Sequence, residues 1–575
     1  MTYDVIIVGS GAAGGMAAFT LASAGANVLL LEAGRDVDVF KEFRTMEWPY
    51  ATPRRGGMPP DEKVLDGDDY RRGPHAGIVR EYDQYRAVYN GIGDPYTKGL
   101  LTDERKMPYT GTPYAWARVR ALGGKTLVWG RVALRLSDYD FKGKSHDGYG
   151  EDWPISYADL APYYDKVDTM LGISGTQENL PQLPDGIFQR PINLTCGEQI
   201  LRKAIKPMGR HLIAGRAGVT TDGVVTNRYR TRCMGRGRCG RGCDIQASFN
   251  SPAGLIYPAK DTGHCTVRTD SIVAQVLLDE HANRARGVRV IDRKTKQELE
   301  FTARAVVLAA STIESTRLML NSKSRAYPTG IANSSGAVGH YFCEHIMGPG
   351  ATGFLPQLAG REVTNDDSRP TGLYIARFRN LAERHPDFIR GYGFQGGAGC
   401  SEYPWVAHGV GGFGSSFKTA VRAKYPTPLS IIAFGEVLPR WENIVETDPV
   451  VKDAWGVPSV RFNYRFGDNE RKMAKDMADT AEEMMRATGA EQISVRREHF
   501  IEGASIHELG TARMGTDPKT SVTNSFGQTH DVKNLFVLDG SIFVTAGCQN
   551  PTWTILALAR RGSEYLVEQL KAGDI

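Results

Sequence analysis

Apolar positions gather in short runs at both ends and in the middle of the chain, with helix-like segments between them. Residues 3–8 form a run of β-branched and aliphatic side chains that predicts a strand. The small residues 12–24 predict a helix, and 28–31 predict a second strand. Later parts repeat this alternation, with strands expected near 266–278, 285–291, 303–309 and 534–538 and helices at 311–320 and 552–570. Such alternation is typical of an α/β fold.

Between residues 339 and 495 the pattern changes to shorter alternating runs. The runs at 372–378 and 429–438 alternate apolar and polar side chains, which is typical of half-buried antiparallel strands. This part of the chain therefore predicts a second, α+β domain with a mostly antiparallel sheet.

Two helices in the chain carry clear start signals. Ser156, with Asp159 three residues later, forms the sequence pattern of a capping box. A long helix is expected over 469–488, with Asp468 as its N-cap and Gly489 as its stop. Its apolar positions recur every three or four residues and predict a face that packs on the core: Met473, Met477, Ala481 and Met484.

Composition and charge fit an ordinary globular enzyme. The 575 residues are 41% hydrophobic and 23% charged, and the formal net charge is only +5, which does not favour nucleic-acid binding. No apolar run reaches transmembrane length. The first strand starts almost at once, and no basic segment with a cleavage site precedes it, so no signal peptide is expected.

The strongest motif stands at the start of the chain. Gly9, Gly11 and Gly14 form a G-x-G-x-x-G turn between the first strand and helix, and Glu32 ends the second strand. Such a turn lets the backbone approach a pyrophosphate at the helix N-terminus, while the acidic residue accepts hydrogen bonds from a ribose. The motif predicts an adenine dinucleotide site; the alternative is a tight turn without a ligand.

Four segments in family order make the chain resemble the glucose-methanol-choline (GMC) oxidoreductases, which are flavin-dependent alcohol-oxidising enzymes. They are the glycine turn with Glu32, the glycine-rich segment 120–130, the segment 505–515 and the run from 534 to 552. Segments 152–164 and 435–445 resemble the branch that contains sugar dehydrogenases and pyranose oxidases. The resemblance covers nearly the whole length of the chain.

The resemblance implies FAD as the cofactor, rather than NAD, and divides the chain into domains. It implies a discontinuous Rossmann-type FAD-binding domain at 1–50, 106–150, 226–338 and 497–575, and a substrate-binding domain at 151–225 and 339–496. Residues 51–105, rich in Pro, Gly and Asp, are expected to form a lid or an interface. The residues implied to bind FAD are Gly9, Gly11, Ala12, Gly14, Glu32, Ala33, Gly123, Gly124, Thr126, Val273, Asp539, Gly540, Pro551 and Thr552. Some pyranose oxidases attach FAD through a histidine where this chain has Val128, so noncovalent FAD is expected.

His507 and Asn550 match the catalytic pair of the family. Removing a hydroxyl proton while a hydride leaves the same carbon calls for a base that is poised near neutral pH, and histidine suits this role. The resemblance places His507 at the N5 edge of the flavin and makes Asn550 the group that orients the substrate oxygen. Alone, His507 could be a core histidine and Asn550 a turn residue. Among the other histidines, His345 is the best candidate to reach the pocket, as a structural contact.

Three cysteines crowd one segment, Cys233, Cys239 and Cys243, and three interpretations stay open. Thiolates could hold an iron–sulfur cluster, as on a similar loop in some sugar dehydrogenases of this branch, although the spacing is one residue off the commonest pattern. A zinc site would need a fourth ligand. The third interpretation is free thiols or one disulfide in a glycine-rich loop.

The expected function is FAD-dependent oxidation of a secondary hydroxyl on a sugar or glycoside, with C3 of a pyranose as a candidate position, by a dehydrogenase rather than an oxidase. The alternatives are a pyranose 2-oxidase, a gluconate or polyol dehydrogenase, a noncatalytic flavoprotein subunit and an NAD-dependent enzyme. The resemblance implies a small subunit and a cytochrome or other electron acceptor as partners. The protein is expected in the cytoplasm, or in the periplasm through a signal-bearing partner.

Overall fold

The computed structural model describes most of the chain. The described residues are 3–43, 107–224, 226–237, 239, 242–362, 371–399, 407, 410–498 and 500–575. The predicted lid or interface at 51–105 lies outside them, as does His499.

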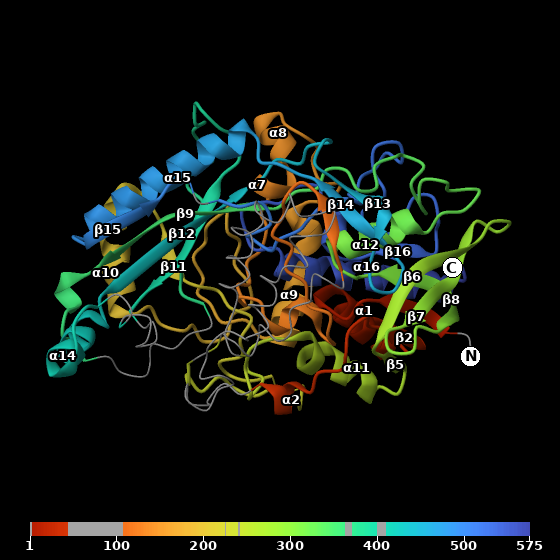
Figure 1. Ribbon diagram of the computed structural model, residues 1–575, viewed down its shortest axis with the longest axis horizontal. Helices are drawn as coiled ribbons and strands as arrows, with labels where there is room; N and C mark the ends of the chain where they lie inside the picture. Colours follow the sequence, from red (N-terminus) through yellow and green to blue (C-terminus); the bar gives the residue numbers. More distant parts are fainter. Residues whose placement is uncertain are drawn as a thin grey trace.

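A seven-stranded sheet carries the predicted α/β half of the fold (Figure 1). Its order is β5 (Cys265–Arg268), β2 (Val28–Leu31), β1 (Tyr3–Val8), β8 (Glu298–Leu308), β7 (Arg284–Asp292) and β6 (Ser271–Asp279), with β16 (Leu535–Val537) also on β8. β1 pairs in parallel with β2 and β8, β2 with β5, and β8 with β16, whereas β7 runs antiparallel to β6 and β8. The strand expected near 266–278 is two strands, because the chain turns at Asp270, which has a φ of +53°.

Helices from distant parts of the sequence lie beside this sheet (Figure 1). The helix α1 (Ala12–Ser23) contacts α16 (Thr552–Ala572), and α16 contacts α9 (Tyr157–Leu171). The predicted capping box is present at the start of α9, where Ser156 Oγ donates to Asp159 at 2.7 Å. The other helices of this half are α11 (Tyr257–Asp261) and α12 (Thr312–Asn321), with α2 (Val39–Glu42), α7 (Asp138–Phe141) and α8 (Gly143–Asp147) in the connections.

A six-stranded antiparallel sheet forms the second half, on the left of Figure 1. Its order is β15 (Glu491–Arg496), β9 (His345–Phe354), β12 (Pro428–Glu436), β11 (Tyr392–Ala398), β10 (Leu373–Ile375) and β4 (Leu212–Ala214). The long helix α15 (Asp468–Ala487) packs on it, and the four predicted apolar positions of this helix are fully buried. The N-cap is Gly467 rather than Asp468, because Glu470 accepts a hydrogen bond from the Gly467 amide at 2.7 Å and fixes the helix start one residue earlier.

The two faces of this sheet have different neighbours. Along β12, Ile431 and Ala433 belong to the core cluster beneath α15. Because successive side chains of a strand point to opposite faces, Ile432 and Phe434 point away from the helix. On β11 the same alternation buries Phe394 in that cluster and turns Gln395 to the opposite face. This second face is where the catalytic candidates lie.

Another three strands form a third sheet. A three-stranded sheet joins β3 (Tyr109–Gly111) to β14 (Pro458–Asn463) in parallel and β14 to β13 (Ile444–Lys452) in antiparallel. The helices α10 (Cys196–Ile205) and α14 (Gly414–Lys424) belong to the antiparallel half. The residue limits of the two domains remain a prediction.

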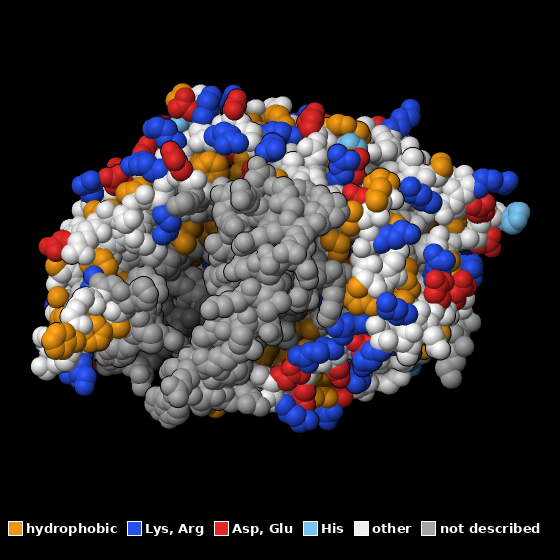
Figure 2. Space-filling view, viewed as in Figure 1, with side chains coloured by type: hydrophobic (Ala, Val, Ile, Leu, Met, Phe, Trp, Pro, Cys, Tyr) orange, Lys and Arg blue, Asp and Glu red, His pale blue; other side chains and the backbone are white. Residues whose placement is uncertain are grey.

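The described surface shows no sign of a single dominant charge on the face drawn in Figure 2, where positive and negative side chains are mixed. Among the described residues, none of the helices combines the length and the apolar character that spanning a bilayer would require.

Candidate active site

The turn between β1 and α1 is shaped to receive an anionic group. Gly9 has a φ of +98°, and a Cβ there would lie 2.4 Å from the Ala309 carbonyl oxygen, so a side chain is excluded. A Cβ at Gly14 would lie 1.8 Å from the Gly9 carbonyl oxygen, so the helix packs directly on the turn. At Gly11, by contrast, a Cβ would meet nothing within 4 Å. Gly11 caps α1 without a side chain, which leaves the first helical amides available to a ligand.

Glu32 lies where a ribose would be expected, at the end of β2. Its carboxylate is buried and accepts hydrogen bonds from Ser10 Oγ at 2.5 Å and from the Gly34 amide at 2.8 Å. Burial raises the pKa of Glu32, while the hydrogen bonds from Ser10 and Gly34 and the charge of Arg120 oppose this. Ser10 Oγ also accepts from the Gly123 amide at 2.9 Å, so it ties the first glycine turn to the second glycine-rich segment.

The second glycine-rich segment forms a short turn of helix, η2 (Gly124–Leu127), beside the first. A Cβ at Gly124 would lie 3.5 Å from the Gly11 Cα, so the two backbones face each other closely. Gly123 has a φ of +103°, and a Cβ there would lie 2.5 Å from the Pro252 ring. Thr126 Oγ1 accepts from the Ser251 amide at 2.9 Å, which makes this hydroxyl a structural group.

One cavity of about 430 Å³ brings most of the predicted residues together. It runs from the first glycine turn and Glu32 to His507 and Asn550. The predicted residues that line it are Gly9, Gly11, Ala12, Glu32, Ala33, Gly124, Thr126, Val273, His507, Asp539, Gly540, Asn550, Pro551 and Thr552. Gly14 and Gly123 do not line the cavity, and their geometry supports packing of the turns instead.

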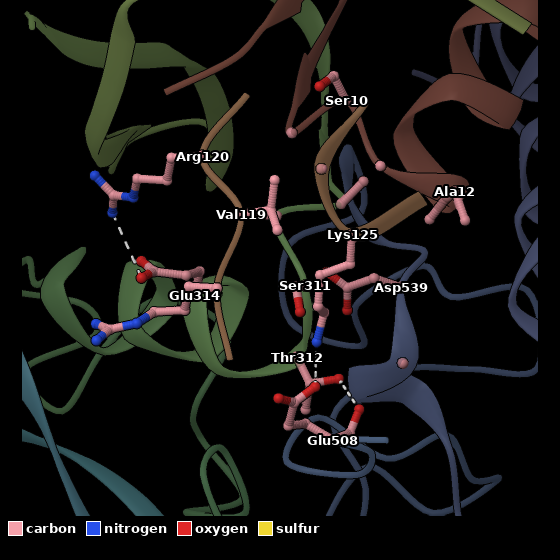
Figure 3. A pocket seen from close by; sticks show the side chains of 18 of the residues that line it. Ser10, Ala12, Val119, Arg120, Lys125, Ser311, Thr312, Glu314, Glu508 and Asp539 are labelled. Atoms are coloured by element: carbon pink, nitrogen blue, oxygen red, sulfur yellow. Dashed lines mark hydrogen bonds and ion pairs between the residues drawn. The ribbon is translucent and has the colours of Figure 1, made fainter. Parts of the chain in front are cut away.

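Buried donors without partners also point to a ligand in this cavity. Arg118 and Arg120 both line it. Nε and Nη2 of Arg118 and Nη1 of Arg120 are buried and have no hydrogen-bond partner within the part of the chain that the structure describes. Arg120 Nη2 lies 3.4 Å from Glu314, and a dashed line joins the two side chains in Figure 3. Charged donors of this kind, in the same cavity as an uncapped helix N-terminus, fit a ligand with phosphate and ribose oxygens such as a dinucleotide.

The middle of the cavity holds a charged pair. Lys125 points to Glu508, and the two form an ion pair (Figure 3). The backbone oxygen of Glu508 accepts from Thr312 Oγ1 at 2.6 Å. Asp539 lies nearby, but its carboxylate accepts hydrogen bonds from Ser315 Oγ at 2.5 Å and from the Ser541 amide at 3.0 Å. Asp539 therefore shapes the backbone at Gly540, and Lys125 is the cation that faces the cavity from η2.

His507 and Asn550, forty-three positions apart in the sequence, are adjacent at the far end of the cavity. Nδ2 of Asn550 lies 3.3 Å from Nε2 of His507. On its other side, Nδ1 of His507 lies 3.1 Å from Nδ1 of His345, with the two rings nearly perpendicular at 83°. The Phe434 ring lies 6.0 Å from the His507 ring, centre to centre. A substrate alcohol that reached Nε2 would therefore meet a base and an amide donor together.

The surroundings of His507 keep its imidazole neutral. The ring faces the cavity, but the protein around it replaces bulk water and lowers the pKa of His507 well below its ordinary value. The positive charge of Lys125 acts in the same direction, as does His345 when it is itself protonated. Burial lowers the pKa of His345 to about 4, which a backbone interaction with Gly547 opposes. Both imidazoles are therefore unprotonated at neutral pH, as a base must be.

Several residues at the site are not marked by the sequence motifs. Ser10, Arg118, Lys125 and Glu508 lie inside or beside the motif segments, but the motifs themselves point to other residues. Gln395 lies far from any motif, on β11, and its Nε2 donates to Asn550 Oδ1. The sequence does mark Gln395 in one way, because it is the single amide side chain in the strand Tyr392–Ala398.

The three-cysteine loop carries free thiols in the described structure. Burial raises the pKa of Cys239 to about 11; the charge of Arg131 opposes this and the neighbouring Cys243 and Cys233 add to it, so the Cys239 thiol is protonated at neutral pH. Over the described ranges, no three His, Cys, Asp or Glu side chains are arranged to hold a metal ion. The described side chains of this loop are therefore not arranged as a metal centre. The iron–sulfur cluster stays a prediction.

Comparison with known proteins identifies the family. Family models described as GMC oxidoreductase match residues 3–347 and 439–559. A 2-methyl-1,2-propanediol dehydrogenase from Mycolicibacterium austroafricanum is 31% identical, over 98% of this chain and 95% of its own length. The fructose dehydrogenase large subunit of Gluconobacter japonicus is 27% identical, over 100% of this chain and 99% of its own. A crystal structure of pyridoxine 4-oxidase from Mesorbium loti has the same fold, with a TM-score of 0.58 at 16% identity over 98% of this chain and 99% of that one.

The chain belongs to the GMC oxidoreductases, a family of FAD-binding enzymes that act on CH–OH donors. The resemblance seen in the sequence is thereby confirmed, and so is the predicted fold of a Rossmann-type domain with a mostly antiparallel second sheet.

Proposed function

We propose that this GMC oxidoreductase oxidises a secondary hydroxyl of a sugar or glycoside to the corresponding ketone, with noncovalently bound FAD as the hydride acceptor. His507 acts as the base, and Asn550 orients the hydroxyl. The observation that carries the proposal is the contact between Asn550 Nδ2 and His507 Nε2, at the end of a cavity whose other end is the Gly9–Gly14 turn.

The chain's own residues fit the cofactor along the whole cavity. The amides at the start of α1 and the cation of Lys125 suit the pyrophosphate, and Glu32 suits the adenosine ribose. When bound, FAD accepts two electrons and the carbinol hydrogen as a hydride. Val128 at the cavity wall has no group that could bond to the isoalloxazine ring, which supports noncovalent binding.

At the carbinol carbon the reaction requires a base for the hydroxyl proton and a hydrogen-bond donor that orients the oxygen. His507 Nε2 takes the hydroxyl proton while the hydride leaves, so the alcohol loses two electrons and two hydrogens and becomes a carbonyl. Asn550 Nδ2, which contacts Nε2 in the described structure, would donate to the same oxygen and hold it in line. The neutral state of both imidazoles supports this assignment, because a protonated His507 could not accept the proton.

A second candidate substrate is a small vicinal diol. The relative that matches 98% of this chain is named for 2-methyl-1,2-propanediol, whose oxidisable hydroxyl is primary, whereas another full-length relative is named for fructose. The antiparallel sheet next to the catalytic pair supports the sugar over the diol. Its face toward the site offers Gln395, which can hydrogen-bond, beside the ring of Phe434, a combination that suits a ring-shaped polyhydroxyl compound.

The electron acceptor and partner belong to the same proposal. We favour a dehydrogenase that passes electrons to a dye, quinone or cytochrome rather than to oxygen. The fructose dehydrogenase relative is named as a large subunit, which supports a small-subunit partner for this chain. An iron and acid-labile sulfide assay on the purified protein tests whether Cys233, Cys239 and Cys243 hold a cluster.

The experiment is a turnover assay with a dye acceptor, under nitrogen and under air, on wild type and on His507→Ala. The substrate panel contains glucosides, gluconate and 2-methyl-1,2-propanediol, and NMR of the product tells a ring ketone from an aldehyde. We expect a keto-sugar, and a loss on the order of 100-fold or more in kcat for the variant with unchanged FAD content. Turnover of the diol alone would overturn the sugar assignment, and equal rates for the two proteins would overturn the base.

A further inference from the structure

A β-bulge turns His345 toward the catalytic base. The register of β9 against β12 shifts between Ile432 and Phe434, so that Ala433 alone opposes the two residues Gly348 and Pro349. Gly348 has a φ of +135°, which a side chain would disfavour. One extra residue in a strand reverses which face the following side chains occupy.

The bulge changes which face of the sheet the side chains at the start of β9 occupy. Ala351, on one side of the bulge, and Ile346, on the other, both belong to the core cluster beneath α15. An unbroken strand would place residues five apart on opposite faces. Because the bulge shifts the alternation, His345 points to the opposite face, where it is 1% exposed and lies 3.1 Å from His507.

The hydrogen bonds around His507 form a chain in which each residue donates to the next, from Gln395 through Asn550 and His507 to His345. Gln395 Nε2 donates to Asn550 Oδ1 at 2.5 Å, so Asn550 presents its Nδ2 to His507. Nε2 of His507 then accepts, and the proton of the neutral ring sits on Nδ1. That proton is donated to Nδ1 of His345, which must therefore be the unprotonated nitrogen of its own ring.

We propose that His345 is a positioning residue for the catalytic base, resting on the proposed function of His507. By accepting from Nδ1–H of His507, it holds the tautomer in which Nε2 carries a lone pair toward the substrate. When the hydroxyl proton reaches Nε2, the bond from Nδ1–H to His345 stabilises the resulting imidazolium. This is the role that a carboxylate has in other histidine-based sites.

The test compares two substitutions at this position. His345→Asn keeps an acceptor oxygen where Nδ1 lies, and His345→Leu removes it. We expect kcat to fall on the order of 100-fold in the Leu variant, by analogy with the loss of other histidine-orienting groups. The Asn variant should recover most of that loss, and KM should change little in either. His264→Asn, at an exposed histidine, is the matched control.

A second measurement does not depend on turnover. The ¹⁵N shifts of the imidazole nitrogens report the tautomer, and the His507 signals are assigned by their absence in His507→Asn. We expect Nδ1–H in the wild type and in His345→Asn, and a mixture of tautomers in His345→Leu.

The outcomes separate the two proposals. If the wild type turns over and the Leu variant matches it, or if His507 carries its proton on Nε2, the role of His345 is wrong. If the tautomers are as expected but no sugar, glycoside or diol is oxidised, the positioning contact stands and the proposed function fails. Retention of FAD in each variant, measured by absorbance, shows that the fold is intact.

Discussion

Gln395 Nε2 donates to Asn550 Oδ1 across 2.5 Å, and this contact joins the antiparallel sheet to the C-terminal segment of the nucleotide-binding half. An asparagine amide can turn by half a rotation at little cost, and its neighbours decide which atom faces the site. With its oxygen occupied by Gln395, Asn550 turns its nitrogen to His507 and to the place of the substrate oxygen. The sheet thereby fixes the donor of the catalytic pair.

The first prediction tests this orientation with a nearly isosteric change. In Gln395→Glu the new carboxylate can only accept, so Asn550 turns its Nδ2 away from His507 to meet it. We expect kcat/KM to fall on the order of 100-fold, whereas Gln395→Leu, which leaves the amide free to turn, loses only about 10-fold. Steady-state kinetics with a dye acceptor measure both. A glutamate variant as active as the leucine variant would contradict the orientation.

The sequence predicts the nucleotide-binding half well because its determinants are local. The turn at Gly9, the acid at Glu32 and the paired segments around His507 and Asn550 are contiguous motifs, and all four residues line one cavity. Gly14 and Gly123 belong to the same motifs but serve packing, since a glycine pattern does not tell a ligand contact from a backbone contact.

Gln395 and His345 could not be assigned in the same way. The role of Gln395 depends on which face of β11 it occupies, and that is set by pairing with β12. The direction of His345 depends on a bulge near Gly348, and one residue of register decides whether it meets His507 or the core beneath α15. Strand register comes from contacts between distant segments, which a single sequence does not display.

The second prediction concerns the affinity for FAD. Lys125 is a cation at the cavity wall, and its partner Glu508 is 2% exposed. In Lys125→Met the cofactor pyrophosphate loses a positive neighbour while Glu508 keeps its negative charge. We expect the Kd for FAD to rise about 10-fold, measured by quenching of flavin fluorescence on the apoprotein at low ionic strength. Glu508→Gln removes the opposing charge and should bind FAD at least as tightly as the wild type. Equal affinities for wild type and Lys125→Met would rule out this role.

The third prediction concerns how the flavin is held. Val128 lines the cavity and carries no nucleophile. Precipitation of the purified protein with acid should therefore release all the flavin, leaving a yellow supernatant and a colourless pellet. Intact-protein mass spectrometry of the denatured chain should show no added flavin mass. Flavin that stays with a washed pellet would mean that another residue forms a covalent bond.

The last prediction is a pH dependence of stability that arises from Glu344. Its carboxyl is fully buried between the Gly503 amide, which donates at 2.7 Å, and Ser505 Oγ, also at 2.7 Å. Burial raises the pKa of Glu344 to about 8 from an ordinary 4.5, against the effect of these two hydrogen bonds. The nearby carboxylates of Glu508 and Glu502 raise it further.

The sign of this pH dependence follows from which state of the protein, folded or unfolded, binds the proton. Between these two pKa values the folded protein holds a proton on Glu344 that the unfolded chain has released, so the free energy of unfolding falls as pH rises. The slope is at most about 1.4 kcal/mol per pH unit. The pKa of His345 is lowered from an ordinary 6.5 to about 4. His345 therefore changes the free energy of unfolding only below about pH 6.5, where acid lowers that free energy. Burial also raises the pKa of Glu436, to about 7, so the contribution of Glu344 is obtained as a difference between wild type and a Glu344 variant from about pH 6.5 to about pH 8.

Glu344→Gln removes this titration while its amide can still accept from Gly503 and donate to Ser505. The difference in Tm between variant and wild type should shift in favour of the variant as the pH rises from about 6.5 to about 8. Glu446→Gln, at an exposed carboxyl, serves as the control and should show the same difference at both pH values. If Glu344→Gln behaves like this control, then Glu344 is ionised in the folded protein and the network behind His507 carries a negative charge.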